Sequence, residues 1–127
     1  MFSLNNISNL FQGITVTKDR QQSIYKWQIK KWDVIIGEAF TKSKKSSMIE
    51  LKMIRRVSKN GKGLMSVLLR EILSDAKKQR KNVEIEVKPF NDPNRPFESV
   101  TQARKRVYHW YKNFGFEING ENGIYRN

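Results

Sequence analysis

A strand-like run, a turn with two glycines and a long amphipathic stretch follow one another between residues 48 and 76, and this succession constrains the fold most. Apolar and polar residues alternate over Met48–Ile54, as in a half-buried strand. Gly61 and Gly63 end that pattern, and apolar residues then recur at helical spacing for about 16 residues from Leu64. The chain must therefore turn sharply from a strand into a helix.

Shorter patterns on either side complete an α+β domain that we expect to span residues 1–127. The predicted order β-β-β-α-β-α-β-β makes one mixed, mostly antiparallel sheet with flanking helices. The expected elements around the central unit are a short helix over 4–11, strands at Tyr25–Ile29, Val34–Phe40 and Val83–Lys88, a Lys/Ser-rich loop at 42–47, a helix over 98–113 and a hairpin of Phe116–Ile118 with Ile124–Tyr125; Ile14–Thr17 is compatible with a further strand.

The charge of the chain predicts a polyanionic partner. Its 127 residues carry 25 Lys and Arg against 12 Asp and Glu, a formal net charge of +13. Such a field attracts nucleic acid, ribosomes or phosphorylated ligands, although a solvated surface has the same composition. The chain has no cysteine, no membrane-length apolar run and no signal-peptide pattern, so we expect a cytoplasmic protein. With one histidine and no cysteine, no metal site is indicated.

The glycine turn fits neither of two well-known nucleotide motifs. A P-loop needs a glycine where Arg56 stands, and a hydroxyl residue where Gly63 stands. A dinucleotide fingerprint needs a glycine at Ser66. A helix N-terminus with exposed backbone N–H groups remains, and such a site binds phosphate or pyrophosphate. Taken alone, the turn is equally compatible with a plain helix entrance.

Other segments give the turn a family context. Tyr111-Lys112-Asn113-Phe114-Gly115-Phe116 resembles the Y-x-x-x-G-F signature of the GNAT superfamily of N-acetyltransferases. Ser58-Lys59-Asn60-Gly61-Lys62-Gly63 is similar to the turn with which that family holds the pyrophosphate of acetyl-CoA. Val34–Ala39 resembles the family's third strand, and Glu86 and Asn91 keep the spacing of its acid and asparagine. The resemblance covers about residues 22–126.

The resemblance implies a central strand that splays from its neighbour and pairs with pantetheine, as a peptide adds to a sheet edge. Acetyl would pass from acetyl-CoA, the cosubstrate, directly to an amine. The cofactor-binding residues implied for this chain are Leu51, Met53, Lys59, Asn60, Gly61, Lys62, Gly63, Leu64 and Asn91. Arg55, Arg56 and Lys78 are candidates for the 3′-phosphate.

Two side chains are the candidates for proton transfer. We expect Glu86, partly desolvated on a central strand, to act as general base through water, with Glu50 and Glu38 in reserve. Glu86 could instead simply face solvent. We expect Tyr111 to act as general acid toward the CoA sulfur, although a packing tyrosine in a buried helix face fits the same pattern.

Three departures leave alternatives open. Ser58 stands where the family has Arg or Gln, so one contact that braces the backbone of the turn is expected to be lost. Arg104 and Val107 replace the family's N-x-x-A run, which puts the cofactor contact of Asn91 in doubt. The long loop 89–99 suggests an unusual acceptor site. The rivals are a catalytically weak CoA-binding protein and a nucleic-acid-binding module whose Tyr25, Trp27 and Trp32 stack on bases. The acceptor would be a protein or a ribosome- or nucleic-acid-associated amine, and a homodimer is compatible with the sequence.

Overall fold

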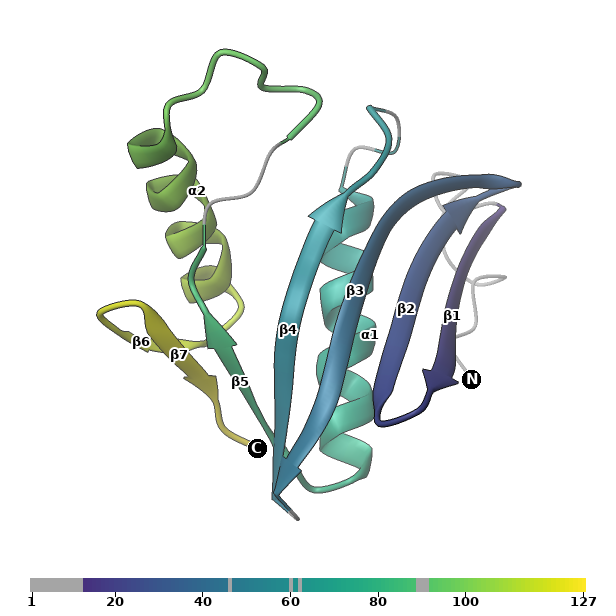
Figure 1. The fold of residues 1–127 in the computed structure, drawn as a ribbon, viewed down its shortest axis with the longest axis vertical. Coiled ribbons are helices and arrows are strands. Elements are labelled where there is room, and N and C mark those ends of the chain that lie inside the picture. Colours follow the sequence, from purple (N-terminus) through teal and green to yellow (C-terminus); the bar gives the residue numbers. More distant parts are fainter. Residues whose placement is uncertain (1–12, 46, 60, 62, 89–91) are drawn as a thin grey trace.

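Seven strands form one mixed sheet in the order β1-β2-β3-β4-β5-β7-β6 (Figure 1). The structure, a computed structural model, describes residues 13–45, 47–59, 61, 63–88 and 92–127. All neighbouring strands are antiparallel except β4 and β5, which are parallel. The elements are β1 (Ile14–Gln21), β2 (Ile24–Lys31), β3 (Val34–Lys45), β4 (Met48–Arg56), α1 (Leu64–Lys78), β5 (Asn82–Glu86), α2 (Val100–Asn113), β6 (Glu117–Asn119) and β7 (Asn122–Tyr125). The predicted α+β class is confirmed.

The first half of the sheet is longer than the hydrophobic pattern predicts. Four strands precede α1 instead of three, because β1 pairs with the whole of β2. The predicted loop over 42–47 is wrong, since β3 continues to Lys45 opposite Met48. The residues at 42–45 are polar on both faces of the strand, so a pattern of alternating apolar and polar residues could not reveal this extension. The helix predicted over 4–11 lies outside the described residues.

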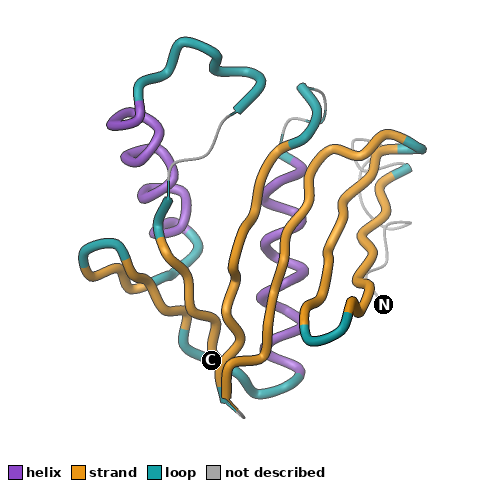
Figure 2. Tube along the Cα trace, in the orientation of Figure 1, coloured by secondary structure: helices purple, strands orange, loops and turns teal. Residues whose placement is uncertain are grey.

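The second helix begins two residues later than expected because a capping box fixes its start. Gln102 N donates to Ser99 Oγ at 3.1 Å, and Ser99 N donates to Gln102 Oε1 at 3.0 Å. These two bonds satisfy N–H groups that a helix end leaves unpaired. Figure 2 shows the part of the loop over residues 92–99 that leads into this helix. Neither α1 nor α2, in the part of the chain that the structure describes, has the length and hydrophobicity to cross a bilayer.

The core lies between the sheet and α1. Leu68 and Leu69 are fully buried on the helix, and Trp27, Ala39 and Ile54 stand in register on the strands that it covers. α2 joins the same core, since Val107 and Tyr111 belong to the same cluster of buried residues. Trp110 Nε1 on α2 donates to Ser66 Oγ on α1 at 3.1 Å, which ties the two helices together.

An extra residue in β4 breaks the regular pairing at the centre of the sheet. Thr41 of β3 stands opposite Leu51 and Phe40 opposite Met53, so Lys52 has no partner on β3 and forms a β-bulge. On its other edge, β4 pairs with β5 only from Met48 to Leu51. Beyond that point the two strands diverge (Figure 1). The predicted splayed central strand is therefore confirmed.

Replacement of Leu68 by alanine tests the core. The side chain is 0% exposed, so Leu68→Ala should lower the free energy of unfolding by about 2–5 kcal/mol through lost burial and a cavity. Denaturant unfolding measures this, with Ser74→Ala on the exposed side of α1 as the control, which should change stability by less than about 0.5 kcal/mol. Equal losses in both variants would contradict the packing described.

Candidate functional site

The diverging strands leave a free backbone edge inside the sheet. From Met53 to Arg56, β4 pairs with β3, but no described strand pairs with the edge of β4 that faces β5. Backbone N–H and C=O groups on such an edge need partners, and an extended amide-containing ligand can supply them. Leu51 and Met53, both predicted to contact the cofactor through the backbone, lie on either side of the bulged residue.

The turn before α1 ends in an uncapped helix N-terminus. Gly61 and Gly63 have φ angles of 80° and 81°, and no side chain caps the helix at Gly63. No acidic residue lies in its first turn, so the positive end of the helix dipole is unopposed there. A Cβ at Gly61 would lie 2.7 Å from Leu64 Cδ1, whereas a Cβ at Gly63 would meet nothing within 4 Å. Gly61 thus faces the protein and Gly63 faces open space.

An arginine that we did not predict for this role braces the turn. Arg56 Nη1 donates to the carbonyl oxygens of Ser58 at 3.4 Å and Gly61 at 3.5 Å. The bracing contact that Ser58 seemed to remove is therefore supplied from the end of β4, two residues before the motif begins. Of the other predicted turn residues, Lys59 is exposed and Leu64 is buried, while Asn60 and Lys62 lie outside the described residues, as does Asn91.

Tyr111 lies in the core with only 4% of its surface exposed. Its ring contacts Phe116 edge-on, with centroids 5.3 Å apart, and Trp110 at 5.2 Å. Burial raises the pKa of the Tyr111 phenol, which therefore keeps its proton at neutral pH. Among the described residues, no buried side-chain oxygen lacks a hydrogen-bond partner, and no hydrogen bond there involves Tyr111 Oη. The hydroxyl therefore reaches accessible surface.

Glu86 occupies the last position of β5, where the two central strands have separated. Half of its side chain (51%) is exposed, and Oε2 lies 3.4 Å from Lys88 Nζ. The desolvation that we expected for this carboxylate is therefore not seen. The strand ends here, and the residue no longer has a neighbour on β4 to cover it.

The two reserve carboxylates already have partners. Glu38 is buried and accepts two hydrogen bonds from the guanidinium of Arg55. Glu50 stands directly opposite Glu84 across β4 and β5, a juxtaposition of like charges. A hydrogen bond to Glu84, together with the charges of Glu84 and Glu50, raises the pKa of the Lys44 ammonium. Lys44 thus offsets the repulsion between the two carboxylates.

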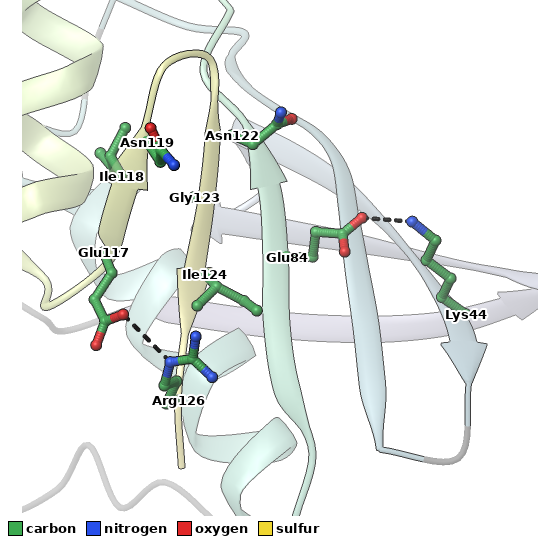
Figure 3. A pocket seen from close by; sticks show the side chains of 9 residues that line it. All are labelled: Lys44, Glu84, Glu117, Ile118, Asn119, Asn122, Gly123, Ile124 and Arg126. Atoms are coloured by element: carbon green, nitrogen blue, oxygen red, sulfur yellow. Dashed lines mark hydrogen bonds and ion pairs between the residues drawn. The ribbon is translucent and has the colours of Figure 1, made fainter.

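A pocket of about 630 Å³ opens on the face of the sheet that carries Glu84 (Figure 3). Glu84 alternates with buried Val83 and Ile85, so this face lies away from the helices. Two ion pairs lie among the residues that line the pocket, one between Lys44 and Glu84 and one between Glu117 and Arg126 (Figure 3). The glycine turn does not line it. The lining residues are Lys44, Glu84, Glu117, Ile118, Asn119, Asn122, Gly123, Ile124 and Arg126.

A smaller cavity of about 240 Å³ adjoins the turn itself. It is lined by Arg56, Gly63, Met65, Ser66, Asp92, Arg95, Arg106 and Trp110. From the sequence, only Arg56 and Gly63 of this set were expected to bind the cofactor. Met65 and Ser66 lie in the first turn of α1, and the other four residues come from the loop and helix that follow β5. Two other predicted phosphate ligands lie elsewhere: Arg55 pairs with Glu38 on the opposite face, and Lys78 ends the 15-residue helix that Gly63 begins.

The aromatic residues proposed to stack on bases do not form an exposed platform. Trp27 is buried, and its Nε1 donates to Thr41 Oγ1 at 3.0 Å. Tyr25 is partly buried, with Lys18 Nζ 4.4 Å from its ring centroid. Only Trp32 is exposed. Within the described residues, no group of three or more His, Cys, Asp or Glu is placed to hold a metal ion.

Comparison with solved structures identifies the fold. A GNAT family acetyltransferase from Elizabethkingia anophelis with acetyl-CoA bound matches with a TM-score of 0.65 and 16% identity, over 85% of this chain and 78% of that one. An acetyltransferase from Streptococcus agalactiae matches with a TM-score of 0.62 and 11% identity, over 91% and 98%. The anti-CRISPR protein AcrVA5 matches with a TM-score of 0.55 and 13% identity, over 87% and 97%. The chain thus has the fold of the GNAT acetyltransferases.

Two other comparisons found nothing. No protein-family model matches the chain, and no curated protein matches its sequence. The likeness to GNAT acetyltransferases therefore lies in the fold, at sequence identities of 11–17% among the structures compared.

Burial of Tyr111 predicts how stability depends on pH. Its phenol has a raised pKa in the folded state, so the unfolded chain loses that proton first as pH rises. The free energy of unfolding should therefore fall above a pH of about 10, the ordinary pKa of tyrosine. Tyr111→Phe should show a smaller loss over the same range, measured by urea unfolding at several pH values. An identical fall in the free energy of unfolding of both proteins would show that the buried phenol of Tyr111 does not cause this pH dependence.

Proposed function

We propose that this protein is an acetyl-CoA-dependent N-acetyltransferase that moves acetyl to a primary amine by direct attack in a ternary complex. The observation that carries the proposal is the interrupted pairing of β4 and β5 beside an uncapped, glycine-lined helix N-terminus. The first feature suits an extended amide-containing chain and the second suits a pyrophosphate, and CoA joins the two groups. The GNAT fold supports the same function.

The chain offers a binding group for each part of the donor. The N-terminus of α1, with Lys59 and Leu64 beside Gly61 and Gly63, would hold the pyrophosphate. The backbone of Leu51 and Met53 would pair with pantetheine. Asn60, Lys62 and Asn91 stay candidates by resemblance, since they lie outside the described residues.

In the reaction, the neutral amine attacks the thioester carbonyl, a C–N bond forms, and the C–S bond breaks to release the thiolate of CoA. Backbone N–H groups along the free edge of β4 would stabilise the oxyanion that develops. Glu86 would accept the amine proton through water, and its exposure gives water access to it. Tyr111, protonated at neutral pH, would give its proton to the departing sulfur.

The acceptor that we propose is an amine on a protein, or an amine associated with a ribosome or nucleic acid. A net charge of +13 repels free polyamines and attracts acidic or phosphorylated surfaces. The alternative of a catalytically weak CoA-binding protein loses support, because Arg56 braces the turn in place of the Arg or Gln that the family has at the position of Ser58. The alternative of a nucleic-acid-binding module that stacks bases on its aromatic residues also loses support, because Trp27 is buried.

A matched pair of glycine variants tests donor binding. Gly63 and Gly120 have positive φ angles of 81° and 66°, and a Cβ at either would meet nothing within 4 Å. Alanine at each should therefore cost about 1–2 kcal/mol of stability through backbone strain alone. Only Gly63→Ala adds a methyl group at the helix entrance, so it should weaken acetyl-CoA binding by at least about tenfold in calorimetry. Equal affinities for the two variants would count against pyrophosphate binding at this turn.

Turnover with a panel of primary amines tests the catalytic roles. Tyr111→Phe and Glu86→Gln should each lower kcat by about 100-fold or more, with acetyl-CoA affinity unchanged, because each removes a proton-transfer group. Thiol release measures the rate. Glu71→Gln, a partly buried acid on α1, serves as the control and should keep wild-type rates. A wild-type protein that binds acetyl-CoA but acetylates no amine would favour the non-catalytic alternative.

A further inference from the structure

Phe97, in the loop before α2, is the most exposed large apolar residue of the part of the chain that the structure describes, with 98% of its surface exposed. Val100, the first residue of the helix, is also exposed. Three residues of chain span at most about 11 Å, so both residues lie at the same end of α2. The loop and this end of the helix form an upper corner of the molecule (Figure 1).

Two successive turns fix the backbone that carries Phe97. Arg95 N donates to the carbonyl oxygen of Asp92 at 2.9 Å, and Glu98 N donates to that of Arg95 at 3.2 Å. A proline occupies the second position of each turn, where its fixed φ angle favours this geometry. The carboxylate of Glu98 is in turn held by the guanidinium of Arg106 at 2.9–3.2 Å. A partner would therefore meet an ordered Phe97, and binding would cost little conformational entropy.

One side of α2 continues this surface with cations. Residues four positions apart follow one another along a helix, and on α2 one such row consists of Val100, Arg104, Tyr108 and Lys112. Arg104 and Lys112 are exposed, as is Lys105 beside the row, and these three cations are called the basic side of α2 below. Tyr108 is partly buried, and Lys112 Nζ lies 5.6 Å from the centroid of its ring.

Within the described residues, the basic side of α2 has no carboxylate to balance it. No Asp or Glu occurs in the sequence between Glu98 and Glu117. Both of these carboxylates already have arginine partners, Arg106 for the first and Arg126 for the second. None of the three cations of the basic side takes part in an ion pair between described residues. Their charge is therefore available to an anionic partner.

These features fit a nucleic acid better than a protein. The centre of a protein–protein interface is depleted of charged residues, and of lysine above all, whereas interfaces with nucleic acids are strongly positive. Unpaired bases stack on exposed aromatic rings, while cations beside the rings bind the phosphates. The bases of a duplex are already stacked on one another, so only a single strand can use Phe97 in this way.

We propose that Phe97 and the basic side of α2 bind a single-stranded nucleic acid, with a base stacked on Phe97 and phosphates on the cations. This function goes beyond the proposed acetyl transfer and does not depend on it. The surface uses none of the three aromatic residues expected from the sequence to stack on bases. It is also separate from the cavity beside the glycine turn, because none of its residues lines that cavity.

The salt dependence of binding tests the role of the cations. The affinity of the full chain for a labelled single-stranded RNA of about 15 nucleotides is measured by fluorescence anisotropy at several salt concentrations. A single strand contributes a slope of about 0.7 per phosphate contact, so the double variant Arg104→Gln, Lys105→Gln should lower the slope of log K against log salt by about 1.4. Lys77→Gln with Lys78→Gln removes the same charge from the end of α1 and should keep the wild-type slope. Equal slopes for all three proteins would overturn the proposal.

Replacement of Phe97 tests the stacking. Phe97→Ala should weaken RNA binding by about tenfold at every salt concentration and leave the slope unchanged, because stacking on a neutral ring releases no counterion. Phe97→Trp keeps an aromatic face and should bind at least as tightly as wild type. Trp32→Ala removes another exposed aromatic side chain and serves as the control, with wild-type affinity expected. Wild-type affinity in Phe97→Ala would contradict the assignment.

Further ligands separate the alternatives. Single strands of RNA and of DNA should both bind more tightly than a duplex of the same sequence, and the tighter of the two identifies the preferred sugar. Equal binding of the duplex would rule out stacking on Phe97. Displacement of the RNA by polyglutamate of the same length would assign the surface to an acidic protein instead. Displacement by acetyl-CoA would place the RNA in the cofactor site and overturn the proposal, whereas a protein that binds no nucleic acid could still transfer acetyl.

Discussion

One unpaired residue in β4, Lys52, is the constraint on which the arrangement of the sheet depends. The bulge at this residue bends the strand just where its pairing with β5 ends at Leu51. On the other side, β5 is held to β7 at Gly123, whose missing side chain leaves room for Ile85; a Cβ there would lie 2.9 Å from Ile85 Cγ1. The two central strands are thus drawn apart from both sides, and the backbone edge between them stays free.

The turn before α1 is organised by the same end of β4. Gly61 packs against the sheet, where a Cβ would lie 2.9 Å from Ile36 Cγ2, and Leu64 is buried beside it. Arg56 then fixes the carbonyls of the turn, and Val57 N donates to Ile36 O at 2.7 Å to extend the strand pairing. The helix entrance is therefore rigidly attached to the sheet on its inner side and open at Gly63. A preorganised anion site needs this combination of fixed and open surfaces.

The sequence predicted the features that depend on local pattern. The α1 helix, the glycine turn and the terminal hairpin follow from periodicity and turn residues within a few positions. The bulge at Lys52 was beyond such reasoning, because it exists only in the register between β3 and β4. The convergence of Arg95 and Arg106 on Arg56 was equally hidden, since it depends on the path of the loop before α2. The splay itself was expected only through the family resemblance.

The sheet also separates two kinds of charged surface. Arg56 points to the side of the helices, where three arginines meet at the cavity by the turn, whereas Arg55, its neighbour, points to the opposite face and pairs with Glu38. That opposite face carries carboxylates and their cationic partners, including Glu84 with Lys44. In the proposed reaction an anionic donor and an amine that begins as a cation must meet at one carbon. The arginine-lined side suits the anionic donor and the carboxylate-bearing side suits the cationic amine, so a net charge of +13 does not by itself exclude an amine acceptor.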